Sequence, residues 1–316
     1  MIRHERGSEP TEPTEPGELP PLLTRTGLGD LRLPNRIVMA PATRARATNE
    51  GLVPTDLHTT YYGQRAGAGL IITGSTWVSE RSIGAINIPG IYSEPQVVAW
   101  RRITSVVHAL GGRIVLQLLH AGSNSHPDHH GGALPAGPSA INPQEVAPTP
   151  AGPKATVVPR EMTTADIDGA LADYHVAAMN ACRAGFDGIE ICANSAYLIA
   201  QFLNRRLNRR SDGYGARRNR LLLEIVDAVT DAWEGRRVGV RLSPYWAVEH
   251  RSFRDQMSGE YPYTADEQTL ADYDGLVAEL NARPLPISTC EVAPRALAPP
   301  PTSMPSRDTA STSTAH

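Results

Sequence analysis

The chain has 316 residues and a formal net charge of −3, and 41% of its residues are hydrophobic. This length fits one large domain or two small ones, and the apolar content is sufficient for a substantial core. Nucleic-acid-binding proteins usually carry a clustered basic face, so the slightly acidic balance argues against a nucleic-acid partner.

Residues 1–18 form a polar leader rich in Pro, Glu and Thr, which we expect to be disordered because it has little to bury. From Leu19 onward, short runs of almost entirely apolar residues alternate with helical segments. Such runs are typical of parallel strands that are covered on both faces. Five of these runs are predicted strands and the last is a sixth candidate: Arg36–Ala40, Leu70–Gly74, Arg113–Leu119, Gly188–Cys192, Arg237–Leu242 and Leu285–Val292.

The helical segments carry start and stop signals. One of them opens with a threonine suited to an N-cap and closes on Gly185, and another ends at a Gly-Gly pair. The predicted helices are Pro54–Ala66, Pro95–Leu110, Thr164–Ala184, Arg218–Trp233 and Thr264–Asn281.

Ser125–Arg160 is a long Pro-, Gly- and His-rich segment without periodicity, and we expect a loop that serves as a lid or binding element. Its clustered histidines, His126, His129 and His130, are expected to be solvated rather than to bind a metal, because a metal needs converging ligands. The three cysteines of the chain have no close ligand spacing, so no metal site is predicted.

Strands alternating with helices indicate an α/β fold, either a (β/α)8 barrel of the TIM type or an open doubly wound sheet. No G-x-G-x-x-G motif follows the first strand, which disfavours the dinucleotide-binding sheet. A complete barrel has eight strands, and this sequence supplies about five to six. We therefore predict an incomplete TIM barrel over residues 19–292. Residues 293–316 are a Pro/Ser/Thr tract, expected to be a disordered tail of the kind that a frameshift would produce.

Polar residues stand at the carboxyl ends of the predicted strands, where a parallel barrel places its chemistry. Thr43 offers a hydroxyl donor, Gln117 an amide that suits the edge of a uracil-like ring, and Arg241 a permanent positive charge. Together they describe a pocket for a flat heterocycle that becomes negative on reduction. Each also has a simpler interpretation: Thr43 as a turn cap, Gln117 paired with backbone and Arg241 in an ion pair.

The motifs around these residues resemble those of the Old Yellow Enzyme family of FMN-dependent ene-reductases, also described as NADH:flavin oxidoreductases. The resemblance runs from about Leu19 to about Pro284. It rests on five motifs that match in order and spacing: LPNRIVMAPATR, QLLH, GFDGIEI followed by AYLIAQFL, NRRSDGYG and VGVRLSP.

The resemblance implies an enzyme in which NADH or NADPH reduces FMN, which then passes hydride to an activated alkene or quinone-like substrate. Tyr197 would protonate the carbon next to the activating group. The flavin contacts implied by the family pattern come from residues after the predicted strands: Pro41, Ala42, Thr43, Ser75, Gln117 and Arg241.

Three departures from the family pattern stand out. Cys192 and Ser195 occupy the two positions that usually hold a His paired with an Asn or a second His, which bind the substrate carbonyl oxygen. A thiol is a poor donor, so weak substrate polarisation is expected. Leu119 stands where many relatives carry Trp, which predicts a wider pocket. The segments that would bind the FMN phosphate after strands seven and eight are not recognisable.

The last departure keeps an alternative open, namely a non-catalytic truncated remnant that does not bind FMN stably. A Schiff-base aldolase barrel is disfavoured because it needs a lysine at a strand end, and the only lysine, Lys154, lies in the long loop.

The odd number of cysteines and the charged amino terminus favour a cytoplasmic protein. No apolar run approaches the ~20 residues of a membrane span, so no membrane partner is expected. The oligomeric state stays open.

Overall fold

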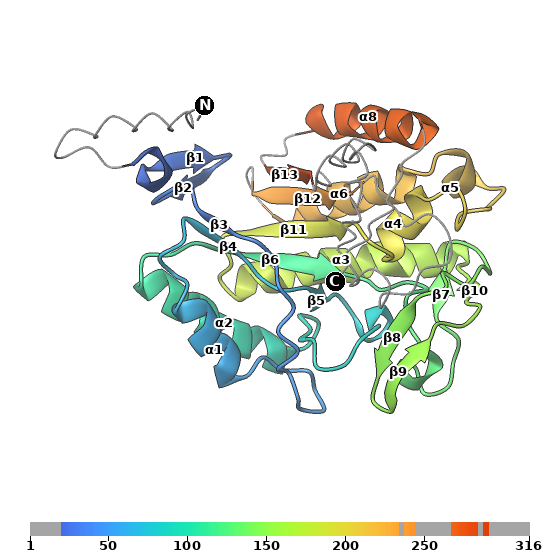
Figure 1. The fold of residues 1–316 in the computed structure, drawn as a ribbon, viewed down its shortest axis with the longest axis horizontal. Coiled ribbons are helices and arrows are strands. Elements are labelled where there is room, and N and C mark those ends of the chain that lie inside the picture. The colour runs from blue at the N-terminus through green and yellow to red at the C-terminus, as the bar shows by residue number, and fades with distance from the viewer. Residues whose placement is uncertain (1–19, 234–236, 244–266, 284–286, 291–316) are drawn as a thin grey trace, which may run out of the picture.

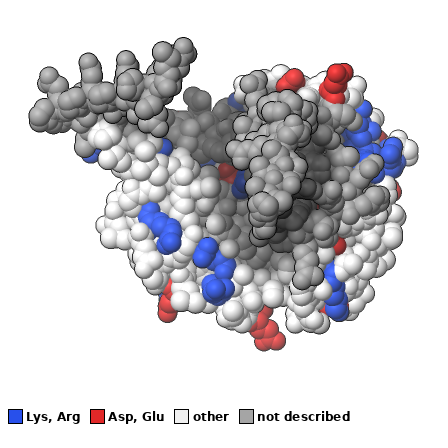
Figure 2. Space-filling view, viewed as in Figure 1, with Lys and Arg blue, Asp and Glu red and all other residues white. Residues whose placement is uncertain are grey.

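The structure is a computed structural model that describes residues 20–233, 237–243, 267–283 and 287–290. Its centre is a parallel sheet with helices around the outer side (Figure 1). The predicted leader, residues 1–18, and the predicted tail, residues 293–316, lie outside the described residues. In the view of Figure 2, the described basic and acidic side chains are scattered in small groups among uncharged surface. No described helix combines the length and apolar character needed to cross a membrane.

Six parallel strands run in the order β13-β12-β11-β6-β4-β3, and β5 pairs with the carboxyl end of β6. Neighbours in the sheet follow chain order, which is the arrangement of a barrel and not of a doubly wound sheet. All six predicted strands are confirmed, and the fold is an incomplete TIM-type barrel. The bounds are β3 Val38–Met39, β4 Leu70–Ile72, β5 Thr76–Trp77, β6 Ile114–Leu119, β11 Gly188–Ala193, β12 Val238–Leu242 and β13 Ile287–Cys290.

The five predicted helices are present, with ends that differ from the prediction by a few residues, and two short helices, α4 and α5, were not predicted. The start and the end of helix α3 both have a local cause. At its start, the Thr163 hydroxyl accepts from the Asp166 N–H at 3.2 Å and the Asp166 carboxylate accepts from the Thr163 N–H at 2.8 Å. After its end, Gly185 adopts a φ of +79°. The helices are α1 Asp56–Gly63, α2 Glu94–Ala109, α3 Thr164–Arg183, α4 Leu198–Leu203, α5 Gly213–Ala216, α6 Arg220–Ala232 and α8 Glu267–Asn281, with short 3-10 turns at Pro21–Leu23, Glu80–Ser82 and Pro127–His129.

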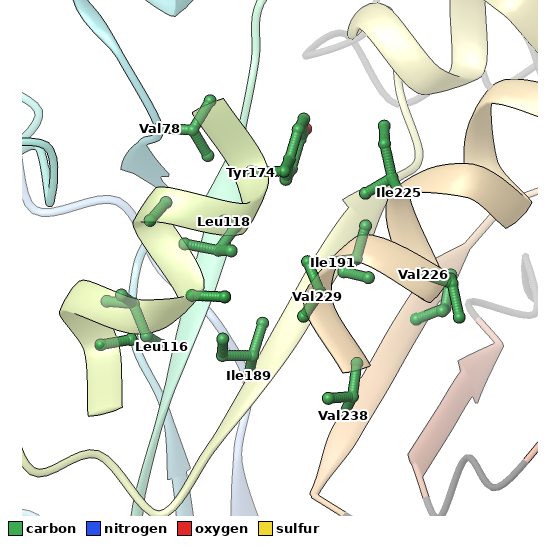
Figure 3. Close-up of a cluster of buried hydrophobic side chains, with 14 of the residues drawn as sticks. Val78, Leu116, Leu118, Tyr174, Ile189, Ile191, Ile225, Val226, Val229 and Val238 are labelled. Atoms are coloured by element: carbon green, nitrogen blue, oxygen red, sulfur yellow. The ribbon is translucent and has the colours of Figure 1, made fainter. Parts of the chain in front are cut away.

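The main core lies between the sheet and the helices. Figure 3 shows alternate strand residues, including Leu116, Leu118 and Ile191, directed toward side chains of α3 and α6 such as Tyr174 and Val229. Alternate residues of a strand point to opposite faces. The residues between them must therefore face the inside of the incomplete barrel.

The inward-facing residues form layers along the strands. Near the strand starts, Val115 packs with Leu70 and Ile72 in a small apolar cluster. Next along β6 and β11 come the polar residues Gln117 and Glu190, which are partners in the strand register. The alternation thus buries an apolar layer below a polar one on the inside of the sheet.

A hairpin of β1 (Thr26–Leu28) and β2 (Leu31–Leu33) adds to the apolar layer, because Leu31 and Leu33 are buried against it. The hairpin turns at Gly29, whose φ of +56° suits glycine. Strands of three residues give too short a pattern for sequence analysis, and this hairpin was not predicted.

The long segment Ser125–Arg160 has more structure than its sequence indicates. It contains β7 (Ala136–Gly137), the hairpin of β8 (Val146–Thr149) and β9 (Gly152–Ala155), and leads into β10 (Arg160–Glu161), which pairs with β7. The expectation of a loop without regular structure was wrong, because the hairpin rests on backbone pairing that its Pro- and Gly-rich sequence does not signal.

The loop histidines were expected to be solvated, but they are half-buried and bonded. His129 Nε2 lies 3.1 Å from the Pro148 carbonyl oxygen, and His130 Nε2 lies 3.0 Å from Ser125 Oγ. His126 Nδ1 accepts from the Asp128 N–H at 3.2 Å. These side chains fasten the segment to itself and to its neighbours.

A glycine after β4 marks a close approach between the carboxyl ends of neighbouring strands. A Cβ on Gly74 would lie 2.7 Å from the Ala42 carbonyl oxygen and 3.0 Å from the Thr43 Cα. Gly74→Ala should therefore displace the segment after β3 and lower the free energy of unfolding by roughly 1–3 kcal/mol in urea denaturation. Gly67→Ala is the matched control, because a Cβ there meets nothing within 4 Å. Equal stability of the two variants would contradict the tight crossing.

Candidate active site

The carboxyl ends of β3 and β4 bring two of the predicted flavin-contacting segments together. The backbone of Ala42 and Thr43 passes directly over Gly74, and Ser75 comes next in the chain. Pro41 and Ala42 are half-buried and Thr43 is exposed. The Thr43 hydroxyl is thus accessible at the same edge of the sheet as Ser75.

A row of polar side chains continues from Ser75 across the next two strands. The Ser75 hydroxyl donates to Gln117 Oε1 at 2.7 Å, and Gln117 Nε2 donates to Glu190 Oε1 at 2.7 Å. Gln117 and Glu190 are almost fully buried. These two bonds fix which end of the amide faces which neighbour, so Gln117 is held in one orientation.

Glu190 is a site residue that sequence analysis missed. A buried carboxylate is tolerated only where hydrogen bonds or charges compensate its lost hydration. The sequence could have revealed it, because alternate residues of a strand share a face and Glu190 stands two residues before Cys192 on β11.

Arg241 lies at the end of β12, directly opposite Cys192 in the strand register. Cys192 is buried in a second apolar cluster with Trp77 and Leu119, and Tyr197 packs against it. Leu119 is a fully buried member of this cluster. The thiol of Cys192 donates to Asn194 Oδ1 at 2.9 Å.

Ser195 does not stand beside Cys192 in the way that Asn194 does. Its φ is +57°, it is exposed, and it occupies the turn between β11 and α4. Asn194 instead is buried against the thiol. The role of Ser195 in holding a substrate stays a prediction.

Tyr197 is the N-cap residue of α4, and this helix is anchored to the neighbouring strand end. Leu198 N–H donates to the His120 carbonyl at 3.0 Å, directly after β6. The buried Gln201 side chain donates to the carbonyls of Ala121 and Ala196, at 2.9 and 2.6 Å. The position of Tyr197 is therefore set by the ends of β6 and β11 together.

The pKa of Tyr197 is raised to about 12, mainly by burial and in smaller part by Cys192 and Glu145, and Arg241 opposes the shift. The phenol thus lies within electrostatic reach of Arg241. At neutral pH it stays protonated and can donate a proton.

Glu145, from the segment before β8, is a second residue that sequence analysis missed. Burial raises the pKa of its carboxyl to about 7. Its backbone is clamped by Thr156: the Glu145 N–H donates to Thr156 Oγ1 at 3.0 Å, and the Thr156 N–H donates to the Glu145 carbonyl at 2.9 Å. The long segment therefore brings this carboxyl within electrostatic range of Tyr197.

The donor set fits a flavin ring. A hydroxyl after β3, an amide from β6 and a guanidinium from β12 lie at or near the carboxyl ends of parallel strands of one sheet. Amide and guanidinium groups match the carbonyl and imide edge of an isoalloxazine. Four residues predicted as site residues thus lie at one edge of the sheet: Thr43, Gln117, Tyr197 and Arg241.

The sequence model of the NADH:flavin oxidoreductase / NADH oxidase family matches residues 22–276. The chain belongs to this family. The family couples FMN to a nicotinamide reductant, which agrees with the chemistry of the donor set.

Relatives within and near the NADH:flavin oxidoreductase family agree with this placement. The flavin oxidoreductase hxnT of Emericella nidulans is 41% identical over 234 residues, which cover 72% of this chain and 60% of that protein. Putative 12-oxophytodienoate reductase-like protein 2A of Arabidopsis thaliana is 37% identical over 229 residues, 71% of this chain and 83% of that protein. The chain spans about 60% of the length of most of the curated relatives it matches.

Solved structures give the same answer for the fold. Morphinone reductase superposes with a TM-score of 0.76 at 39% identity, covering 86% of this chain and 71% of that one. The Old Yellow Enzyme homologue from Zymomonas mobilis superposes with a TM-score of 0.74 at 35% identity, covering 86% of this chain and 73% of that one.

The raised pKa of Glu145 predicts a pH-dependent stability. A carboxyl whose pKa is higher in the folded state favours folding while protonated, so its contribution is complete below about pH 4.5 and is lost as the pH rises through about 7. Glu145→Gln, neutral throughout, should therefore be more stable than the wild type at pH 8.5 by up to about 3 kcal/mol, with little difference at pH 4.5.

Urea denaturation of both proteins at the two pH values measures this effect. Glu50→Gln, at an exposed position, is the matched control and should show no pH-dependent difference. A stability difference for Glu145→Gln that stays constant between pH 4.5 and 8.5 would contradict a buried, protonated carboxyl.

Proposed function

We propose that this chain is an FMN-dependent oxidoreductase that passes hydride from NADH or NADPH to the carbon–carbon double bond of a small activated alkene. The observation that carries the proposal is the convergence of the Ser75–Gln117–Glu190 row, Arg241 and Tyr197 at one edge of the sheet. Relatives are named as reductases of 12-oxophytodienoate, chanoclavine-I aldehyde and morphinone, which supports a small-molecule acceptor.

The residues of the polar row would hold the cofactor. When bound, FMN supplies the exchange of hydride between the nicotinamide and the alkene. Arg241 offers a fixed positive charge where the ring becomes negative on reduction, and such preorganised charge needs no rearrangement during reaction. Gln117 offers an amide whose orientation Glu190 and Ser75 already set. Thr43 adds a hydroxyl donor from the neighbouring strand end.

Tyr197 would act as the general acid. Alkene reduction needs a proton on the carbon next to the activating group once hydride has reached the other carbon. The phenol keeps its proton at neutral pH, and it releases the proton from Oη to that carbon as negative charge develops there. Arg241 opposes the rise in the pKa of the phenol, which eases this release.

Purified full-length protein should carry FMN and reduce 2-cyclohexenone at the expense of NADH or NADPH. Tyr197→Phe should slow alkene reduction by roughly 10²–10⁴-fold, because it removes the proton donor, and leave nicotinamide oxidation with an alternative acceptor unchanged. Tyr92→Phe removes a hydroxyl from the same apolar cluster and should change neither rate.

Stopped-flow absorbance of the flavin separates the two half-reactions. Colourless protein that takes up no added FMN would overturn the proposal in favour of the non-catalytic remnant. Alkene reduction by Tyr197→Phe at the wild-type rate would overturn only the role of Tyr197 as proton donor and would leave the proposed FMN-dependent activity standing.

Weak polarisation of the substrate carbonyl should limit the wild-type rate, because a thiol and a serine hydroxyl replace stronger donors. Loss of such a donor typically lowers the rate by ~10²–10³-fold. The double variant Cys192→His with Ser195→Asn should therefore raise cyclohexenone reduction by up to about that factor. Steady-state rates with holoprotein measure the gain. Cys182→Ala changes an exposed thiol and is the control; no gain from the double variant would count against these two positions.

A further inference from the structure

One carboxyl near the candidate active site has no role in the proposed mechanism. Glu145 directly precedes β8, whose Pro148 carbonyl oxygen lies 3.1 Å from His129 Nε2. His129 belongs to the short 3-10 turn that follows β6 in the chain, and Tyr197 is held at the end of β6 by the bond from α4 to the His120 carbonyl. Both residues are thus anchored near one strand end, and Glu145 lies within electrostatic range of the Tyr197 phenol.

A network of short hydrogen bonds holds the backbone at Glu145 in place. Thr156 Oγ1 accepts from the Glu145 N–H at 3.0 Å and donates to Asn142 Oδ1 at 2.7 Å. Asn142 Nδ2 donates to the Thr156 carbonyl at 2.8 Å, and Asn142 Oδ1 accepts from the Gln144 N–H at 2.9 Å. The position of residue 145 is therefore set before any ligand binds, which lowers the cost of binding one there.

Within the described part of the chain, the carboxyl of Glu145 has neither a counter-charge nor a hydrogen-bond donor, and burial alone raises its pKa to about 7. The residue is only half-buried, and neither of its carboxyl oxygens is sealed from solvent without a partner. A ligand can therefore reach this carboxyl. A carboxylate that has lost part of its hydration is stabilised by an opposite charge close by.

As an anion, Glu145 opposes the chemistry proposed for this site. It contributes to the raised pKa of Tyr197, and so disfavours release of the phenolic proton. Negative charge also develops on the alkene as hydride reaches it, and a carboxylate in range repels that charge. A positive charge on the substrate, placed beside Glu145, offsets both effects.

We propose that the preferred substrate is an activated alkene that also carries a protonated amine, and that Glu145 binds this amine. The carboxylate selects a cationic alkene over a neutral one of the same shape, because only the cation compensates its charge. This inference rests on the proposed function, since it names the class of alkene that the same site takes.

Two derivatives of 2-cyclohexenone form a matched pair of probes, one with a dimethylaminomethyl group on the ring and one with an isobutyl group in its place. Their shapes are alike, but the amine is protonated at neutral pH, as alkylamines are. At about pH 8, above the pKa of the carboxyl, the wild type should favour the amine by about tenfold or more in kcat/KM. Glu145→Gln, which keeps the shape and removes the charge, should reduce this preference to about twofold or less.

Glu50→Gln removes an acidic group at an exposed position and is the matched control, so it should keep the wild-type preference. An equal loss of rate for both probes in Glu145→Gln would overturn the inference, because a structural or proton-donating carboxyl affects neutral and cationic alkenes alike.

Calorimetric titration of the full-length protein with each probe, without nicotinamide, measures the same preference as a ratio of Kd values. A binding preference that Glu145→Gln removes, in protein that reduces neither probe, would support the amine site and contradict the proposed function alone. Reduction of both probes by the wild type with equal efficiency would contradict the amine site alone.

Discussion

The strict two-residue alternation of β6, β11 and β12 is the constraint on which the rest of the structure depends. It sends one set of residues to the helices and the other to the inside of the incomplete barrel. Because Gln117 and Glu190 fall in the inward set, two polar groups are buried side by side and must satisfy each other. A shift of one residue in either strand would place them among α3 and α6 and would expose the apolar set to the candidate site.

The elements that could be predicted from sequence are those with a local cause. Capping residues such as Thr163 and Asp166 define helix ends within a few positions, and continuous apolar runs define buried strands. The strand-end residues Thr43, Gln117 and Arg241 could be placed at one edge because parallel strands share a direction. The structure adds the bonds that orient them, which no local pattern contains.

The parts that could not be predicted depend on contacts between distant segments. The pairing of Gln117 with Glu190 joins residues far apart in the chain, and the clamp of Glu145 depends on Thr156 from the opposite side of a hairpin. The position of Asn194 beside the Cys192 thiol follows from a turn in which Ser195 adopts a positive φ. Sequence analysis had assigned Ser195 from its place in the family motif and could not foresee the conformation of the turn.

The clamp on Glu145 has a consequence for how this site can diverge. Thr156 holds residue 145 entirely through its main chain, by one N–H and one carbonyl. These two bonds use no atom of the Glu145 side chain. The main-chain clamp therefore survives a change of residue at position 145, and only the charge that this position contributes changes.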